Sequence, residues 1–351
     1  MKMTFRWYGK SDPVKIEYIR QIPVIDSVVS AVYDVQVGEV WSEESISEIK
    51  NAALSAGLTF EVVESVPVHE DIKLGRATRD GYIANYAENL MRLGRAGVKC
   101  VCYNFMPVFD WLRSELKMPL PDGSNALAYD EETVLGMDPA KSELSLPGWD
   151  ESYTREQLKE LLKSYENIGE KELFDNLRYF LEAVIPVAEK AGINMAIHPD
   201  DPPWGIFGLP RIITDLEHMK RFLSLYPSEN NGLTFCTGSF GASRDNDLVK
   251  MISAAEGRIH FAHLRNIKID GYRRFHETGH PTREGSLDMP GIVRALLESG
   301  FDGYVRPDHG RMIWGESGRP GYGLYDRALG AMYLYGLFEA CGAKFDKKER
   351  K

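Results

Sequence analysis

The sequence predicts an α/β protein of the (β/α)8 barrel class, on three observations. Eight short runs rich in Val, Ile, Phe, Tyr and Thr recur along the 351 residues, and segments with helical spacing of apolar residues lie between them. Ala-Gly or Ser-Gly pairs repeatedly separate a helix from the next strand. The length suits two domains or one large barrel, and no interdomain linker interrupts the alternation, so we expect one barrel domain over residues 1–351.

The elements can be assigned in order along the chain. After the second strand, Ser42 can cap a helix with one apolar face, and Gly57 ends it. A longer helix carries leucines at spacings of four across residues 173–181, and Asp288 can cap a helix over residues 289–297. The expected strands are residues 4–9, 27–33, 59–65, 99–105, 194–200, 231–238, 258–266 and 303–309.

One long segment interrupts this alternation. About sixty residues, 106–169, separate the fourth strand from its helix, and loops of that length usually have a function. We expect short helices at residues 154–165 and 111–116 within it. The segment follows the carboxyl end of a strand, where barrel active sites are built, so we interpret it as a cap or interface element.

Composition excludes several classes of function. With 52 acidic against 42 basic residues the net charge is -10, which disfavours nucleic acid as a partner. The first residues lack the apolar run of a signal peptide, and the apolar stretch at 329–338 is a buried helix too short to cross a membrane. Four scattered cysteines suit a reducing compartment. We therefore expect a cytoplasmic protein that acts on a small molecule, without nucleic-acid or membrane partners.

Four consecutive strands end in residues that commonly bind metals: His198, Cys236, His263 and Asp308. The carboxyl ends of parallel strands meet at one edge of a barrel, so these side chains can converge on one ion. A lone Cys or His at a strand end is more often a buried or hydrogen-bonded residue, and only the joint placement favours a metal. Mixed N, S and O ligands suit zinc first, and iron(II) or manganese also fit.

Several segments resemble a known family over nearly the whole chain. They are FRWYG at 5–9, ESVPVHED at 64–71, HPDDPPW at 198–204, PDHGR at 307–311 and GYGLYDR at 321–327. These segments are similar to the D-mannonate dehydratases of bacterial hexuronate catabolism. The resemblance implies a xylose-isomerase-like barrel, one Mn²⁺ or Fe²⁺ ion on the four ligands named above, and a hydro-lyase reaction that converts D-mannonate to 2-keto-3-deoxy-D-gluconate.

That reaction needs a base for the C2 proton and an acid for the leaving C3 hydroxyl group. We expect His309, directly after Asp308, to be one of them, and a tyrosine, Tyr322 or Tyr325, to be the other. Flanking glycines favour Tyr322. A hydrogen bond from His309 to a metal-bound carboxylate, and packing of the tyrosines at a helix start, are the alternatives. The sequence leaves open which group is the base and which the acid.

A sugar-acid substrate also needs cationic and polar partners. Guanidinium groups grip a carboxylate through two hydrogen bonds, and the candidates near strand ends are Arg6, Arg265 and Arg306. Salt bridges with Asp200, Asp201 or Glu64 are the alternative for each of them. His69 and Asn104, at the ends of the third and fourth strands, could bind sugar hydroxyls.

Other readings stay open. His276 and His280 have a spacing typical of some metal sites, but they lie near glycine and proline, so we expect a loop, or a lid, there. A sugar isomerase or epimerase could use the same barrel and metal. A barrel-type metal-dependent endonuclease fits the ligand set but not the net charge of -10. A homo-oligomer, such as a dimer, is compatible with the sequence.

Overall fold

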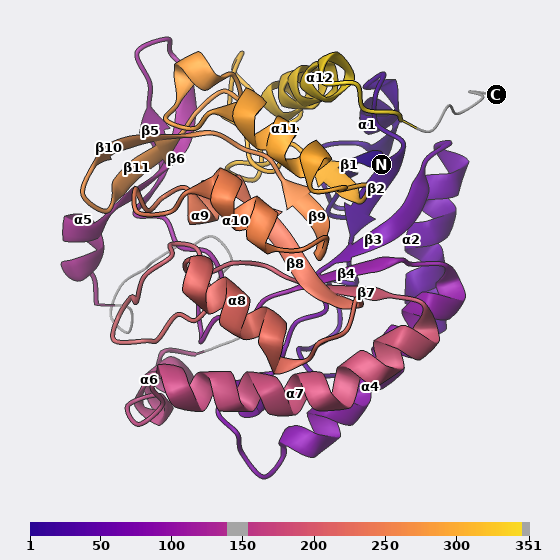
Figure 1. The fold of residues 1–351 in the computed structure, drawn as a ribbon, viewed down its shortest axis with the longest axis vertical. Helices are drawn as coiled ribbons and strands as arrows, with labels where there is room; N and C mark the ends of the chain where they lie inside the picture. Colours follow the sequence, from indigo (N-terminus) through magenta and orange to yellow (C-terminus); the bar gives the residue numbers. More distant parts are fainter. Residues whose placement is uncertain (139–153, 346–351) are drawn as a thin grey trace.

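The computed structural model describes residues 1–138 and 154–345, and in it eight parallel strands close into a barrel (Figure 1). Hydrogen-bonded neighbours follow the order β1-β12-β9-β8-β7-β4-β3-β2. Each of the eight expected strands overlaps one observed strand, so the predicted (β/α)8 barrel is confirmed. The barrel strands are β1 (Lys2–Arg6), β2 (Ser27–Ser30), β3 (Thr59–Glu64), β4 (Cys100–Tyr103), β7 (Asn194–Ile197), β8 (Asn231–Cys236), β9 (Ile259–His263) and β12 (Tyr304–Arg306).

The barrel interior is filled by side chains that alternate along the strands. A cluster of buried residues comes from the strands alone: Val29, Val62, Cys100, Cys102, Ala196 and Phe261. Side chains two apart on a strand share a face, and the rings of Phe261 and His263 accordingly lie 4.3 Å apart. His263 therefore lies on the same inward face of β9 as Phe261, at the carboxyl end of the strand.

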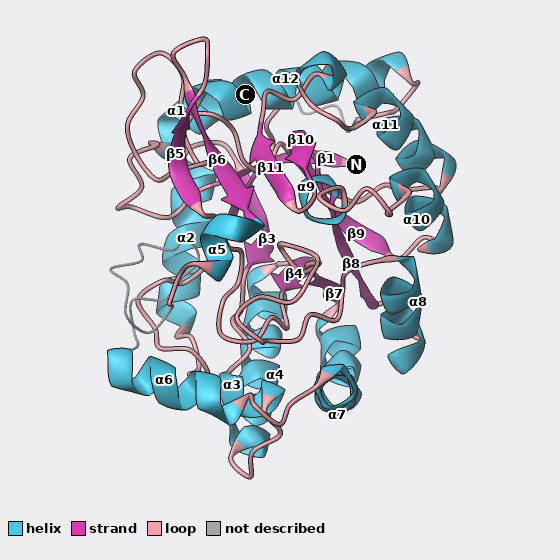
Figure 2. Cartoon of the chain, turned by 90° about the vertical axis from the view of Figure 1, so that its left-hand side faces the viewer, coloured by secondary structure: helices cyan, strands magenta, loops and turns pink. Residues whose placement is uncertain are grey.

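Helices cover the outside of the barrel (Figure 2). Ser42 caps α2 by accepting a hydrogen bond from the Ser45 amide, and Asp288 caps α11 through the Gly291 amide, as predicted. No helix of residues 1–138 or 154–345 is long and apolar enough to cross a membrane. The helices are α1 (Ile16–Gln21), α2 (Glu43–Ser55), α3 (Glu70–Lys73), α4 (Arg79–Ala96), α5 (Glu131–Leu135), α6 (Arg155–Ser164), α7 (Glu170–Ala191), α8 (Leu216–Leu225), α9 (Thr237–Phe240), α10 (Leu248–Ala254), α11 (Met289–Glu298) and α12 (Tyr325–Ala340), with a 3₁₀ turn at Thr282–Glu284.

The segment after β4 builds a second, smaller sheet. Its strands β5 (Glu115–Pro119) and β6 (Asn125–Asp130) pair antiparallel and continue into β11 (Arg274–Glu277) and β10 (Ile267–Gly271), a hairpin that follows β9. Figure 2 shows β5 and β6 beside the barrel. Two parts of the chain that are distant in sequence thus form one element above the carboxyl ends of the barrel strands.

Three expectations for these segments have different outcomes. The helix expected at 154–165 is confirmed as α6, which Thr154 and Gln157 cap reciprocally. The prediction of a helix at 111–116 was wrong. Trp111 forms an isolated β-bridge with Asp201, and residues from 115 onward form β5, along which exposed and less exposed side chains alternate. The prediction of a loop around His276 was wrong for His276 itself, because this residue lies in β11, which pairs with β6. Residues 139–153 of the insertion and 346–351 of the charged tail lie outside the described residues.

Candidate metal centre and active site

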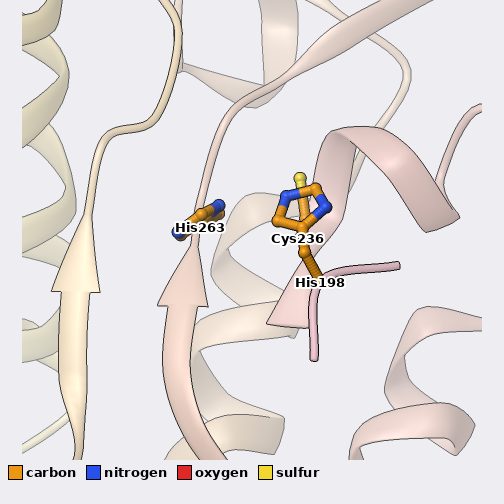
Figure 3. A group of neighbouring side chains, drawn as sticks. All are labelled: His198, Cys236 and His263. Atoms are coloured by element: carbon orange, nitrogen blue, oxygen red, sulfur yellow. The ribbon is translucent and has the colours of Figure 1, made fainter. Parts of the chain in front are cut away.

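Three of the expected metal ligands meet at the carboxyl ends of neighbouring strands. His198 directly follows β7, Cys236 ends β8 and His263 ends β9. The register of β8 and β9 places Cys236 opposite His263. One donor atom from each of the three side chains lies within 4.8 Å of the other two (Figure 3). Parallel strands that end at one edge account for this convergence.

The fourth expected ligand, Asp308, lies at the same place. Its Oδ2 is 3.5 Å from Sγ of Cys236, and its Oδ1 is 3.7 Å from Nδ1 of His263. The backbone of Asp308 has a φ of 60°, a conformation that is uncommon outside glycine and that clusters at functional sites. The loop after β12 therefore directs this carboxylate toward the other three donors.

The chemistry of this donor set fits a divalent transition metal. Two imidazoles, a thiol and a carboxylate offer N, S and O ligands. Burial raises the pKa of Asp308, but its interactions with Arg306, His309 and His263 outweigh burial and hold the pKa well below its usual range. Asp308 is therefore an anion at neutral pH. Both Cys236 and His263 are fully buried, so an ion held here would be shielded from bulk water.

A cavity opens beside these donors. Its walls combine residues of the barrel with Trp111 of the inserted segment and Tyr8, which follows β1. Eight of the expected site residues line it: Arg6, Asn104, His198, Arg265, Arg306, Asp308, His309 and Tyr322. Residues expected to bind metal, to bind substrate and to transfer protons thus share one cavity.

The three arginines form salt bridges at this cavity, as the alternative interpretation expected. Arg306 pairs with Glu64 at 3.0 Å and Arg6 pairs with the same carboxylate at 3.2 Å, while Arg265 pairs with Asp201 at 2.6 Å. However, Nε and Nη1 of Arg306 and Nε of Arg6 are buried and form no hydrogen bond within the part of the chain that the structure describes. These donors could serve an anion in the cavity.

His309 stands between two hydrogen-bonding partners. Its Nε2 lies 2.9 Å from the hydroxyl of Tyr322, and its Nδ1 lies 2.8 Å from Oε1 of Glu277. The Trp111 ring packs 4.7 Å from the imidazole ring. Burial raises the pKa of Tyr322, so its hydroxyl keeps its proton at neutral pH. This arrangement can accept and donate protons beside the metal donors.

Comparisons with known proteins identify the family in which this site occurs. The sequence profile of the family described as D-mannonate dehydratase (UxuA) matches residues 1–348. The chain belongs to the D-mannonate dehydratase (UxuA) family. It is 57% identical over 342 residues to mannonate dehydratase 2 of Halalkalibacterium halodurans, a match that covers 97% of this chain and 99% of that protein. The resemblance seen in the sequence is confirmed.

Solved structures agree with this family. The crystal structure of mannonate dehydratase from Streptococcus suis serotype 2 matches with a TM-score of 0.92 and 49% identity, over 100% of this chain and 99% of that one. A D-psicose 3-epimerase structure matches with a TM-score of 0.58 over 96% of this chain and 99% of that one, but at 12% identity. That likeness is one of fold alone, so it does not support the epimerase alternative.

Two expected site residues lie elsewhere in this D-mannonate dehydratase family member. Tyr325 begins α12 with 42% of its surface exposed, and its ring packs 5.6 Å from that of Trp314. His69 caps α3 by accepting a hydrogen bond from the Asp71 amide, and its ring stacks 3.6 Å from that of Tyr82. Neither lines the cavity. The catalytic role of Tyr325 and the substrate-binding role of His69 stay predictions, which the lining of the cavity does not support.

The small sheet and the segment that leads into it bring two further residues to the site, neither of which was predicted from the sequence. Glu277 of β11 contacts His309, and Arg113 bridges Glu277 and Asp201 at 2.8 Å each. Along β11, Phe275 and Glu277 are buried, whereas the alternate residues, Arg274 and His276, are more exposed. Residues two apart on a strand share a face, so Glu277 lies on the same covered face as the apolar Phe275.

Proposed function

We propose that this protein is a metal-dependent hydro-lyase that converts D-mannonate to 2-keto-3-deoxy-D-gluconate and water. Membership of the D-mannonate dehydratase family supports this reaction. The observation that carries the proposal is that two expected metal ligands, His198 and Asp308, line the same cavity as the His309 and Tyr322 pair. The donor atoms of Cys236 and His263 lie within 4.8 Å of that of His198. A dehydration of this kind requires charge stabilisation and proton transfer in one place.

We propose that His198, Cys236, His263 and Asp308 hold one divalent ion, Mn²⁺ or Fe²⁺. When bound, the ion would stabilise the negative charge that develops on a sugar acid as its C2 proton leaves. The ionised Asp308 contributes charge, and the register of β8 and β9 fixes the separation of Cys236 and His263. Arg265, whose Nε lies 3.0 Å from Oδ2 of Asp308, orients that carboxylate.

Arginines orient the substrate in this proposal. The free N–H donors of Arg306 and Arg6 are suited to the carboxylate of mannonate, because a guanidinium group binds planar anions through more than one hydrogen bond. Glu64, which also lines the cavity, pairs with both guanidinium groups, at 3.0 Å and 3.2 Å. Asn104, on the same cavity, is the candidate for a sugar hydroxyl.

His309 and Tyr322 move the protons. Nε2 of His309 offers a lone pair, and the hydroxyl of Tyr322 carries a proton 2.9 Å away. One member can therefore take the C2 proton while the other protonates the departing C3 hydroxyl, after which the enol becomes the ketone. The reaction would belong to hexuronate catabolism in the cytoplasm.

A substrate panel tests the proposal. The purified protein is incubated with Mn²⁺ or Fe²⁺ and with D-mannonate, other aldonates, or aldoses, and the 2-keto-3-deoxy acid and any ketose are quantified. The proposal expects a 2-keto-3-deoxy acid from D-mannonate and no aldose–ketose exchange. Ketose formation without dehydration would instead support the isomerase alternative.

A further inference from the structure

Glu277 is the point at which the small sheet meets the proton-transferring pair. Glu277 is 1% exposed, and three side chains lie within hydrogen-bonding distance of its Oε1. Arg113 approaches at 2.8 Å through Nη2, His309 at 2.8 Å through Nδ1, and Arg265 through Nη1. Neither the sequence analysis nor the reaction proposed above gives this carboxylate a role.

The surroundings of Glu277 dictate which nitrogen of His309 carries hydrogen. Burial raises the pKa of Glu277, but its interactions with His309, Arg265 and Arg113 outweigh burial and lower the pKa to about 2. An ionised carboxylate only accepts hydrogen bonds, so Nδ1 of His309 must donate to it. In a neutral imidazole, Nε2 is then the nitrogen with the free lone pair.

The nearby guanidinium group does not alter this assignment. Nη1 of Arg265 lies 3.0 Å from Nδ1 of His309, but a guanidinium group cannot accept a hydrogen bond. Both nitrogens donate to the same oxygen of Glu277, and this shared acceptor explains why they lie close together. The ring therefore presents Nε2 toward the hydroxyl of Tyr322.

We propose that Glu277 is the positioning residue of His309: it fixes the Nδ1–H tautomer and the ring orientation, so that Nε2 faces Tyr322 and the cavity. This inference rests on the proposed function, in which His309 and Tyr322 transfer protons. Arg113 holds Glu277 in turn, because it also pairs with Asp201 at 2.8 Å. The inserted segment, which contributes Arg113, thereby takes part in orienting a barrel residue.

Two substitutions separate positioning from packing. Glu277→Gln keeps the shape of the side chain, but its amide can donate a hydrogen bond and so stabilise the other tautomer. Glu277→Asp changes the shape and keeps an acceptor-only anion. We expect kcat to fall about 100-fold or more in Glu277→Gln, with KM and metal content little changed, because an analogous carboxylate-to-amide change beside a catalytic histidine costs about 10⁴. Glu277→Asp should retain at least about tenfold more kcat than Glu277→Gln.

A higher kcat in Glu277→Gln than in Glu277→Asp would overturn the inference, because the isosteric amide preserves packing better than the shorter side chain does. A kcat of Glu277→Gln within about threefold of the original enzyme would overturn it as well. Fall of both variants to background with loss of bound metal would also count against positioning, because the carboxylate would then be supporting the centre itself.

A spectroscopic measurement tests the inference without turnover. Nitrogen NMR of the ¹⁵N-histidine-labelled protein, loaded with diamagnetic Zn²⁺, reports which imidazole nitrogen carries hydrogen, and His309→Asn assigns the signal. We expect Nδ1–H in the original protein, retention of that signature in Asp326→Asn, and its loss in Glu277→Gln. Asp326 is the matched control because it is a buried carboxylate that pairs with Arg311 and does not line the cavity.

An Nε2–H signal for His309 in the original protein would overturn the inference whatever the kinetics show. Failure of the original protein to dehydrate D-mannonate would refute the proposed function alone, because the tautomer signature does not depend on turnover.

Discussion

Nδ1 of His309 and Oε1 of Glu277 are joined at 2.8 Å, although the two residues lie 32 positions apart in the chain. His309 follows the last barrel strand, whereas Glu277 belongs to the small sheet that the inserted segment completes. The hydrogen bond therefore couples the orientation of a residue at the barrel edge to an element outside the barrel. In this D-mannonate dehydratase family member, the insertion also contributes Trp111 to the wall of the cavity.

Substitution of the thiol tests the metal centre. We expect Cys236→Ser to lose most of its bound Mn²⁺ or Fe²⁺ and its turnover, because a hydroxyl is a poorer metal ligand than a thiolate. Cys341→Ser is the control, since Cys341 is exposed. Metal content by mass spectrometry and the rate of D-mannonate dehydration check this. Full metal and full rate in Cys236→Ser would remove the thiol from the ligand set.

The two tyrosines should behave differently. We expect Tyr322→Phe to lower kcat about 10²–10⁴-fold, the usual contribution of a general acid or base. Tyr325→Phe should stay within about twofold, because Tyr325 lies outside the cavity. Steady-state kinetics on D-mannonate compare them. A larger loss in Tyr325→Phe than in Tyr322→Phe would contradict the assignment.

Substrate binding should depend on the buried arginines. Arg6→Gln is expected to raise KM for D-mannonate about tenfold or more, because a hydrogen bond to a charged group contributes about 1.5–3 kcal/mol. Lys10→Gln serves as the control, since Lys10 pairs with Glu48 on the surface. An unchanged KM in Arg6→Gln would show that Arg6 serves only its salt bridge with Glu64.

His260 gives a pH prediction away from the active site. Burial lowers its pKa to about 4, and its Nε2 forms no hydrogen bond with residues 1–138 or 154–345. His260 therefore binds a proton more tightly in the unfolded chain than in the folded one. The contribution of His260 to the free energy of unfolding is full above about pH 6.5 and is lost as the pH falls toward 4.

His260→Gln should accordingly flatten the decline of the free energy of unfolding between about pH 6.5 and pH 4, by up to about 1.4 kcal/mol per pH unit. Urea unfolding at several pH values measures this slope. An equal slope in both proteins would mean that His260 does not titrate differently in the folded and unfolded chains.

The sequence predicted the features that depend on local patterns. The alternation of strands and helices indicated the barrel, and the residues at the ends of consecutive strands indicated the donors, because the carboxyl ends of parallel strands necessarily meet. Cys236 and His263 are adjacent for this reason alone.

Glu277 and Arg113 could not be placed in this way. Their positions depend on the pairing of β6 with β11, two short strands far apart in the chain, and long-range antiparallel pairing has no local signature. The flanking glycines favoured Tyr322, but the sequence kept Tyr325 as a second candidate. Helix α12 begins at Tyr325, and the side chain of Tyr325 is exposed. The positions that the sequence did not predict are therefore set by the second sheet and by the first residue of a helix.

Reconstitution with metal decides whether dehydration by this protein depends on a bound ion. The protein is stripped of metal, verified by elemental analysis, and titrated with Mn²⁺ or Fe²⁺ while the 2-keto-3-deoxy acid formed from D-mannonate is measured. The account predicts negligible product from the stripped protein and activity that rises to a plateau at one ion per chain. Undiminished dehydration by the verified metal-free protein would contradict it.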